Sequence, residues 1–296
     1  MGKKFTIGVL IGNVHTAHPK DLMRGIRAAA SGMDVNVIYF LGTQSVRFNQ
    51  KFALEDFDYQ YNTVYDYAKL AKVDVLIIAY GSLCIFQKNE DKQAFLDKFA
   101  GIPYVLLEDA TDDPRGIYVM VDNFGGMQKC VEHLIIEHHL KHLVYLGGPE
   151  DNQDAIERKA AFLNVMAEHH LPVTPEMMAV GDYSEFVDNL VEQLLKDNPD
   201  AEAIISANDE MTVACYRVCK AHGLRIGKDI LITGFDDVER ARYSNPPLTT
   251  VSQDAYKMGQ IAVEKAVDIC AGRPVESVRL DAELIIRESC GLSLIH

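Results

Sequence analysis

The sequence lacks the features of a membrane or secreted protein. No apolar run approaches the roughly 20 residues that a membrane-spanning helix needs. The start, MGKKFTIGVLIGN, imitates a signal peptide, but its apolar run is short and β-branched and has no small-residue cleavage site. We interpret it as a first strand. The six cysteines are scattered without a Cys-x-x-Cys pair, which favours buried reduced thiols over disulfides. These absences predict a cytoplasmic protein with no membrane partner.

Basic charge is scarce as well. The chain has 43 acidic and 29 basic residues, a formal net charge of −14, and it contains no basic run. A surface this negative repels phosphate backbones. We therefore expect that the chain does not bind nucleic acid by itself.

Motifs for catalysis and metal binding are also missing. There is no Gly-x-Ser-x-Gly, no phosphate-binding Gly-x-x-x-x-Gly-Lys-Ser/Thr and no His-Glu-x-x-His. His138 and His142 stand four apart in EHHLKH, but helix-end histidines that complement the helix dipole explain them better than a metal does. Cys215 and Cys219, also four apart, fit small core residues. We expect no enzyme, no cofactor and no metal.

What the sequence does contain is an alternation of apolar strands and amphipathic helices. Continuous apolar strands separated by helices predict parallel sheets covered on both faces. The expected strands span 5–12, 35–42, 73–81, 102–109, 142–149, 201–209 and 229–237, with a weak strand near 177–180 and an extended run over 278–289. Helices are expected after most of them, including 61–72 and 154–170, and Gly223 should end one of them. A chain of 296 residues suits two lobes or one large domain, and 110–116 is the best candidate for a crossing between lobes.

Polar side chains follow several of these strands. In parallel sheets, ligands bind beyond the carboxyl ends of the strands, so these residues are candidates for binding a ligand rich in hydroxyls or ring nitrogens. The candidates are Asn13, His15, Tyr80, Ser82, Asn208, Asp209, Asp236 and Asp237. For each of them a structural role competes about evenly. Asn208 also suits a helix N-cap, Asp209 a first helical turn, and Asp236 or Asp237 a loop cap.

Several long segments resemble the lactose/galactose-repressor (LacI/GalR) family. The most specific is DILITGFDDVERARYSNPPLTTVSQDAYKMGQIAVEKAV, with its Gly-Phe-Asp-Asp turn followed by Pro-Pro-Leu-Thr-Thr-Val. VDNFGGMQKCVEHLIIEHHLKHLVYLGGPEDNQDAIERKAAFLNVM, SANDEMTVACYRVCKAHGLRIGKDI and IIRESCG match other parts of the family. The resemblance is specific over 117–291 and looser over 5–109.

The resemblance implies an α/β fold of the periplasmic-binding-protein type I, with two Rossmann-like parallel-sheet lobes joined by three crossings. It places one lobe at 1–118, completed by about 254–282, and the other at 119–253, completed by about 283–296. Arg158, Asn208 and Asp236 match positions that usually touch the effector. Gln253 matches a position near the hinge, and Asp122 a common acidic position at the first crossing.

Two departures from the family pattern limit what can be carried over. Only MGKK precedes the first strand, where repressors carry a DNA-binding helix-turn-helix domain, so we expect no DNA-binding domain in this chain. The first lobe lacks the Asn-Pro-Phe-Phe stretch and has an aromatic insert over 44–62. In the first lobe, the expectation of effector contacts therefore depends only on the positions of Asn13, His15, Tyr80 and Ser82 after strands.

The resemblance implies a homodimeric sensor in which lobe closure on a sugar or nucleoside-like effector is the signal for transcription. DNA would be reached only through a helix-turn-helix domain. Two alternatives stay open at this point. One is a sensor domain of a diguanylate cyclase or histidine kinase. The other is a transport-type sugar-binding protein, which should carry an export signal and fewer free thiols.

Overall fold

The chain divides into two compact units. The computed structural model describes residues 4–42, 58–83 and 89–291. Unit 1 comprises residues 1–121 and 255–280, and unit 2 comprises residues 122–254 and 281–296. The chain therefore passes between the units three times, after residues 121, 254 and 280, beside the expected 118, 253 and 282.

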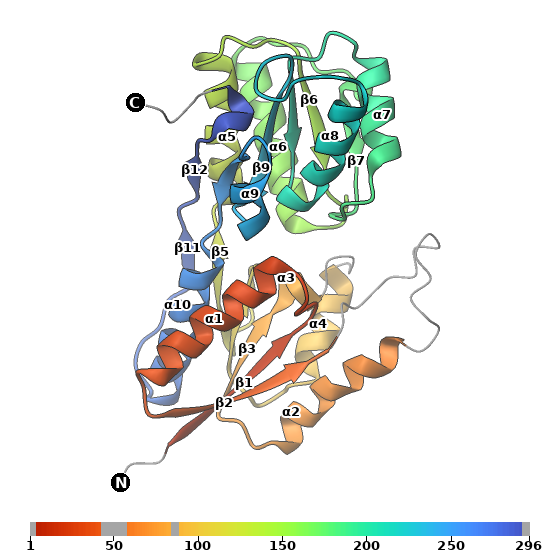
Figure 1. The fold of residues 1–296 in the computed structure, drawn as a ribbon. Coiled ribbons are helices and arrows are strands. Elements are labelled where there is room, and N and C mark those ends of the chain that lie inside the picture. Colours follow the sequence, from red (N-terminus) through yellow and green to blue (C-terminus); the bar gives the residue numbers. More distant parts are fainter. Residues whose placement is uncertain (1–3, 43–57, 84–88, 292–296) are drawn as a thin grey trace. The chain divides into compact units, whose positions relative to one another are not determined.

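Unit 1 is built on a six-stranded parallel sheet (Figure 1). Its strand order is β11 (Val278–Leu280), β5 (Gly116–Val121), β4 (Tyr104–Leu107), β3 (Val75–Ala79), β1 (Phe5–Ile11) and β2 (Val35–Leu41). Every residue of β3 and β4 is buried. The sheet is accompanied by α1 (Ala17–Ser31), η1 (Asp58–Asp66), α2 (Tyr67–Leu70), α3 (Tyr80–Leu83), α4 (Asn89–Asp97) and α10 (Ala255–Cys270).

Helices α1 and α10 lie side by side against this sheet (Figure 1). Glycines allow the two backbones to approach closely. A Cβ atom added at Gly25 of α1 would lie 1.9 Å from the carbonyl oxygen of Tyr256, and one added at Gly259 of α10 would lie 2.4 Å from that of Leu22. The contact therefore depends on the absence of a side chain at both positions.

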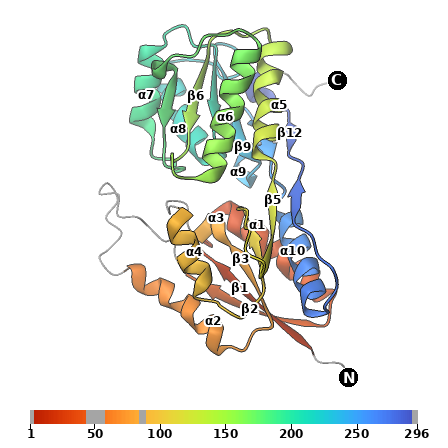
Figure 2. The same cartoon turned by 180° about the vertical axis from the view of Figure 1, so that it is seen from behind.

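Unit 2 repeats the architecture (Figure 2). Its strand order is β12 (Glu283–Ile285), β10 (Thr249–Ser252), β9 (Leu231–Asp236), β8 (Ala203–Ser206), β6 (Leu143–Gly147) and β7 (Met178–Val180). All neighbours are parallel except β10 and β12. The helical elements are α5 (Asn123–Ile136), α6 (Gln153–Glu168), η2 (Pro175–Met177), α7 (Asp188–Asp197), α8 (Asp209–Ala221), α9 (Glu239–Tyr243) and η3 (Glu288–Cys290). Helices α5 and α6 cover one face of the sheet, and α7 and α8 cover the other.

The predicted fold class is confirmed by these two sheets, and the differences lie at particular elements. The helix expected over 61–72 is wrong in its first half, where a 3₁₀ helix spans Asp58–Asp66. That segment is rich in Tyr, Asn, Thr and Val, which are weak helix formers. Residues 44–57 of the aromatic insert lie outside the described residues. Helix α9 was not expected, and the final extended run divides into β11, β12 and η3.

None of the described helices combines the length and the hydropathy that a membrane crossing requires. The five described cysteines are free. Cys215 and Cys219 are fully buried in the core, as their spacing predicted, whereas Cys84 lies outside the described residues.

Candidate functional site

Arg158 is a buried cation in unit 2. It lies on α6 and its side chain is 3% exposed. Its Nε donates to Asn123 Oδ1 over 2.8 Å, and its Nη1 donates to the carbonyl oxygen of Ala207 over 2.6 Å. The guanidinium carbon also stands 3.8 Å from the centroid of the Phe235 ring. Stacking and hydrogen bonding therefore hold the guanidinium in one orientation.

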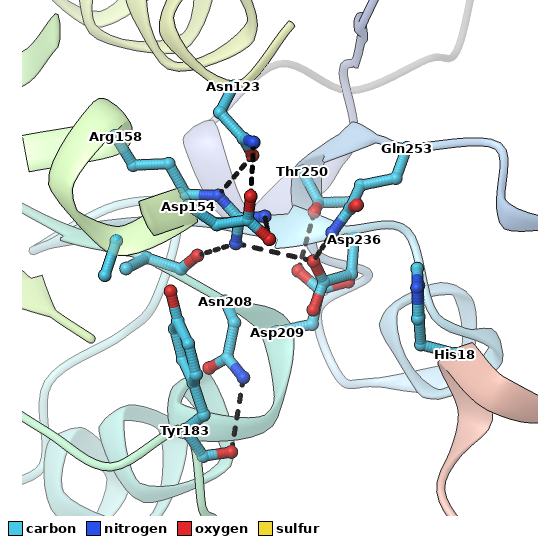
Figure 3. Close-up of polar contacts among 12 residues, drawn as sticks. His18, Asn123, Asp154, Arg158, Tyr183, Asn208, Asp209, Asp236, Thr250 and Gln253 are labelled. Atoms are coloured by element: carbon cyan, nitrogen blue, oxygen red, sulfur yellow. Dashed lines mark hydrogen bonds and ion pairs between the residues drawn. The ribbon is translucent and has the colours of Figure 1, made fainter. Parts of the chain in front are cut away.

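Two carboxylates flank this guanidinium (Figure 3). Asp236 Oδ1 lies 3.6 Å from Nη1 of Arg158, and Asp154 Oδ2 lies 3.9 Å from Nη2. Burial lowers the pKa of Arg158, but the two carboxylates, together with Tyr183, more than offset this and leave its pKa above the ordinary value. Both ion-pair distances exceed hydrogen-bond length, and two of the five N–H groups donate within the described residues.

Asp236 ends β9, and Gln253 follows β10, the next strand of the sheet. The Gln253 amide donates to Asp236 Oδ1. Asp236 has φ +122° and Asp237 has φ +52°, both in the region that favours glycine. Such backbone costs roughly 1–3 kcal/mol per residue and persists where surrounding contacts determine it. Here Asp237 pairs with Arg287 over 2.5 Å and with Arg242 over 3.1 Å.

Asp209 is a neighbour of Asp236, but its side chain is buried in the core rather than directed toward the surface. One of its oxygens accepts a hydrogen bond from the Thr250 hydroxyl over 2.6 Å, and the other accepts one from the Val238 N–H over 3.0 Å. Burial raises the pKa of Asp209 well above the usual carboxyl range, and the neighbouring Asp236 carboxylate raises it further. Asp209 therefore fixes the ends of β9 and β10 from inside.

Asn208 and Asp122 both cap helices. Asn208 Oδ1 accepts from the Met211 N–H over 3.0 Å, and its Nδ2 donates to the carbonyl oxygen of Tyr183 over 3.2 Å. Asp122 Oδ1 accepts from the Gly125 N–H over 3.0 Å at the start of α5. The oxygen and the nitrogen of the Asn208 side-chain amide are thus both hydrogen-bonded within unit 2. The helix N-cap role accounts for these contacts.

Asn123, next to Asp122, is the residue that sequence reasoning missed. It is fully buried, accepts from Arg158 and donates through Nδ2 to Asp154 Oδ1 over 2.8 Å. Figure 3 shows Asn123 and Asp154 beside the Arg158 guanidinium. Asn123 is the second residue after β5, a strand that was not among those expected, so the position rule was not applied to it.

The candidates of unit 1 lie after β1 and β3. The Asn13 carbonyl accepts hydrogen bonds from the Thr16 N–H and hydroxyl over 2.9 and 3.0 Å, in a turn where Asn13 has φ +51°. His15 is exposed in the same turn. This turn leads directly into α1.

Tyr80 and Ser82 are buried in α3, directly after β3. The Ser82 hydroxyl donates to the Ala79 carbonyl over 2.9 Å, and the Ser82 N–H donates to Glu108 Oε2 over 3.1 Å. The Lys92 ammonium lies 5.6 Å from the centroid of the Tyr80 ring. These contacts tie α3 to the end of β4.

Two side-chain contacts at the end of β4 were also missed by sequence reasoning. Glu108 is buried and contacts His18 Nε2. Lys92 pairs with Asp109 over 2.7 Å. Glu108 and Asp109 are the last two residues of the strand expected at 102–109 and directly follow β4 in the structure, so the position rule could have selected them.

His138 and His142 of the EHHLKH stretch contact different residues. Helix α5 ends at Ile136, before both. His142 pairs with Asp200 over 3.0 Å. His138 instead lies against His133, with 3.3 Å between their Nε2 atoms. The prediction that both histidines end a helix was wrong, because the backbone leaves the helix at Glu137.

The chain is similar in sequence and in fold to known proteins. The family model described as periplasmic binding protein-like domain matches residues 131–290. The transcriptional regulator CelR of Thermobifida fusca is 30% identical over 216 residues, which is 70% of this chain and 62% of that protein. The chain thus spans less than two thirds of that relative's length.

Solved structures show the same fold. A CelR–cellobiose complex superposes with a TM-score of 0.80 at 24% identity, covering 97% of this chain and 85% of the other. The lac repressor dimer bound to operator and an anti-inducer gives the same TM-score and identity, covering 97% and 82%. The chain belongs to the family of periplasmic binding protein-like domains.

Proposed function

We propose that this chain is the effector-sensing part of a LacI/GalR-like transcriptional regulator, without a catalytic role, and that its ligand is a sugar or nucleoside-like molecule. The observation that carries the proposal is the Arg158 guanidinium, held buried and oriented beside Asp236. The regulators to which the chain is similar support it, and the CelR structure holds cellobiose, a sugar.

The side chains of Arg158, Asp236 and Gln253 together suit a ligand that carries vicinal hydroxyls. A guanidinium donates from fixed directions, a carboxylate accepts two hydrogen bonds, and an amide does both. Arg158, Asp236 and Gln253 supply one of each, on α6, at the end of β9 and after β10. A purely apolar ligand could not replace the water at the remaining hydrogen-bonding positions of these groups, at a cost of roughly 1–3 kcal/mol for each lost partner.

Signalling would follow from a population shift. An effector that contacts one arrangement of the domain better than another favours that arrangement by the difference in binding free energy, and by no more. We propose that a homodimer transmits the change. With a net charge of −14, the chain itself is not expected to contact DNA.

A thermal-shift screen against sugars and nucleosides tests the proposal. A ligand present at 100 times its Kd stabilises the native state by about 2.7 kcal/mol, so at least one member of the panel should raise the melting temperature. Calorimetric titration of that ligand should then show direct binding to the protein. A panel in which no sugar or nucleoside binds would contradict the ligand class.

Variants then test the site. Arg158→Ala and Asp236→Asn should each abolish the ligand-induced shift. Because breaking a buried ion pair costs roughly 3–5 kcal/mol, Arg158→Ala is also expected to lower the basal melting temperature, whereas Asp236→Asn keeps the side-chain shape. Arg217→Ala is the matched control, since Arg217 forms an exposed pair with Asp188. A full response in Asp236→Asn would show that the ligand binds elsewhere.

A further inference from the structure

We propose that unit 2 carries a second site, a Zn²⁺ site formed by His133, His138 and Cys290. His133 lies in the last turn of α5, His138 follows the C-cap Glu137, and Cys290 ends η3. Figure 1 shows the end of the described chain, in dark blue, beside α5. The ligating atoms of the three residues all lie within 4.8 Å of one another.

The distances between the donor atoms fit a tetrahedral ion. With Zn–N bonds of about 2.0–2.1 Å, tetrahedral geometry places two nitrogens roughly 3.3–3.4 Å apart. The Nε2 atoms of His133 and His138 are 3.3 Å apart. A Zn–S bond of about 2.3 Å places the sulfur roughly 3.6 Å from each nitrogen. The Cys290 sulfur lies within 4.8 Å of a ring nitrogen of each histidine, so side-chain movement of about an ångström brings the donors to these distances.

The donor set selects the ion. Two imidazoles and a thiolate suit borderline-soft Zn²⁺, whereas Mg²⁺ and Ca²⁺ require oxygen ligands. His133 is 8% exposed and Cys290 is fully buried, while His138 is only partly buried. The cation therefore has access from the His138 side, where water can supply the fourth ligand.

Binding requires one proton to leave. The Cys290 thiol now donates to the Arg287 carbonyl over 3.3 Å. On metal binding the Zn–S bond replaces the S–H bond, the proton passes to solvent, and the imidazoles coordinate through nitrogen lone pairs. Nothing is oxidised or reduced in this step.

A plain hydrogen bond between the two imidazoles is the competing explanation. Their rings are 4.9 Å apart and nearly perpendicular, at 82°. One neutral ring could donate to the other at 3.3 Å. That explanation gives Cys290 no role, whereas the metal site needs the sulfur. A bound metal would link the end of α5 to the last described residues of the chain, and its binding free energy would add to the stability of the folded state.

Titration of the metal-free, untagged 296-residue protein with Co²⁺ tests the site, because Co²⁺ reports its ligands by absorption. We expect one Co²⁺ per chain, a thiolate-to-cobalt charge-transfer band, and displacement of Co²⁺ by Zn²⁺. His138→Ala should raise the Kd for Co²⁺ at least tenfold. Cys290→Ser should remove the charge-transfer band.

His142→Ala is the matched control, because His142 lies in the same stretch but pairs with the exposed Asp200. It should bind Co²⁺ as the unaltered protein does. Circular dichroism of each variant separates loss of ligand from loss of fold, and His138 is the more tolerant position since it is partly exposed. Absence of the charge-transfer band in the unaltered protein would overturn the proposal. Undiminished binding by a folded His138→Ala variant would do so too.

Discussion

At the scale of single residues, the unusual backbone at the end of β9 explains why two acids stand together after a buried strand. Asp237 turns toward Arg287 and Arg242, which anchor the turn. Asp236 is thereby directed toward Arg158 and Gln253. The two adjacent carboxylates therefore have different roles. Asp237 stabilises the strained turn, and the turn directs Asp236 toward Arg158.

Asp209 gives a prediction about pH. Its pKa is raised in the folded state by burial, so between the unfolded value of about 3.9 and the folded pKa the native state binds more protons than the unfolded state. Its contribution to stability is therefore fully present below pH about 3.9 and is lost as the pH rises through the folded pKa. Relative to Asp209→Asn, the unaltered protein should lose up to about 1.4 kcal/mol per pH unit in this window.

Urea unfolding of both proteins at several pH values from 5 to 8 measures this difference. Asp229→Asn is the control, since the Arg225 hydrogen bonds lower the pKa of Asp229 to about 2 and its ionisation does not change in that range. If the advantage of the unaltered protein over Asp209→Asn instead grew with pH, the Thr250 and Val238 donors would outweigh burial.

At the scale of elements, the contact between α1 and α10 depends on glycine. Gly25→Ala would place a Cβ atom 1.9 Å from a backbone oxygen of Tyr256, which cannot move independently. Overpacking costs typically about 1–3 kcal/mol or more, against a gain of about 1 kcal/mol in helix propensity. We expect a net decrease in the free energy of unfolding, measured by chemical denaturation.

Gly32→Ala is the matched control for this variant. Gly32 follows the same helix with φ −86°, and the nearest atom to an added Cβ would be 3.6 Å away. A change within about 0.5 kcal/mol is expected there. Equal stability of Gly25→Ala and the unaltered protein would mean that the two helices can separate without cost.

At the scale of the whole molecule, unit 2 is completed by residues from the end of the chain. Strand β12 pairs with β10, and η3 packs against β9. The Ser289 hydroxyl donates to the Ile232 carbonyl over 2.6 Å and accepts from the Thr249 N–H over 2.7 Å. Both bonds are buried, so their loss leaves backbone groups of β9 and β10 without these partners.

Truncation after residue 280 should therefore act on one unit. Unit 1 keeps all its residues, because β11 ends at Leu280. We expect hydrogen-exchange protection to fall in β9 and β10 and to persist in β3 and β4. Ser289→Ala should give the same pattern with a smaller decrease. Equal loss of protection in both units would show that they unfold as one cooperative body.

The sequence by itself determined the two sheets and the strand ends that carry polar residues. The apolar runs of β3, β6 and β8 are fully buried, and local periodicity is enough to recognise such runs. The Gly-Phe-Asp-Asp turn was recognised in the same way, from adjacent residues. Arg158 was selected only by family resemblance, because nothing in its local pattern distinguishes it from a surface arginine.

Only the tertiary structure decided which polar groups meet. It brought Asn123 to Arg158 and left Asp122 as a helix cap, although the two are neighbours in sequence. It also placed His138 against His133, while His142 pairs with Asp200. These contacts depend on where helices end and on how the ends of neighbouring strands are arranged in a sheet. Spacing along the chain does not contain those distances.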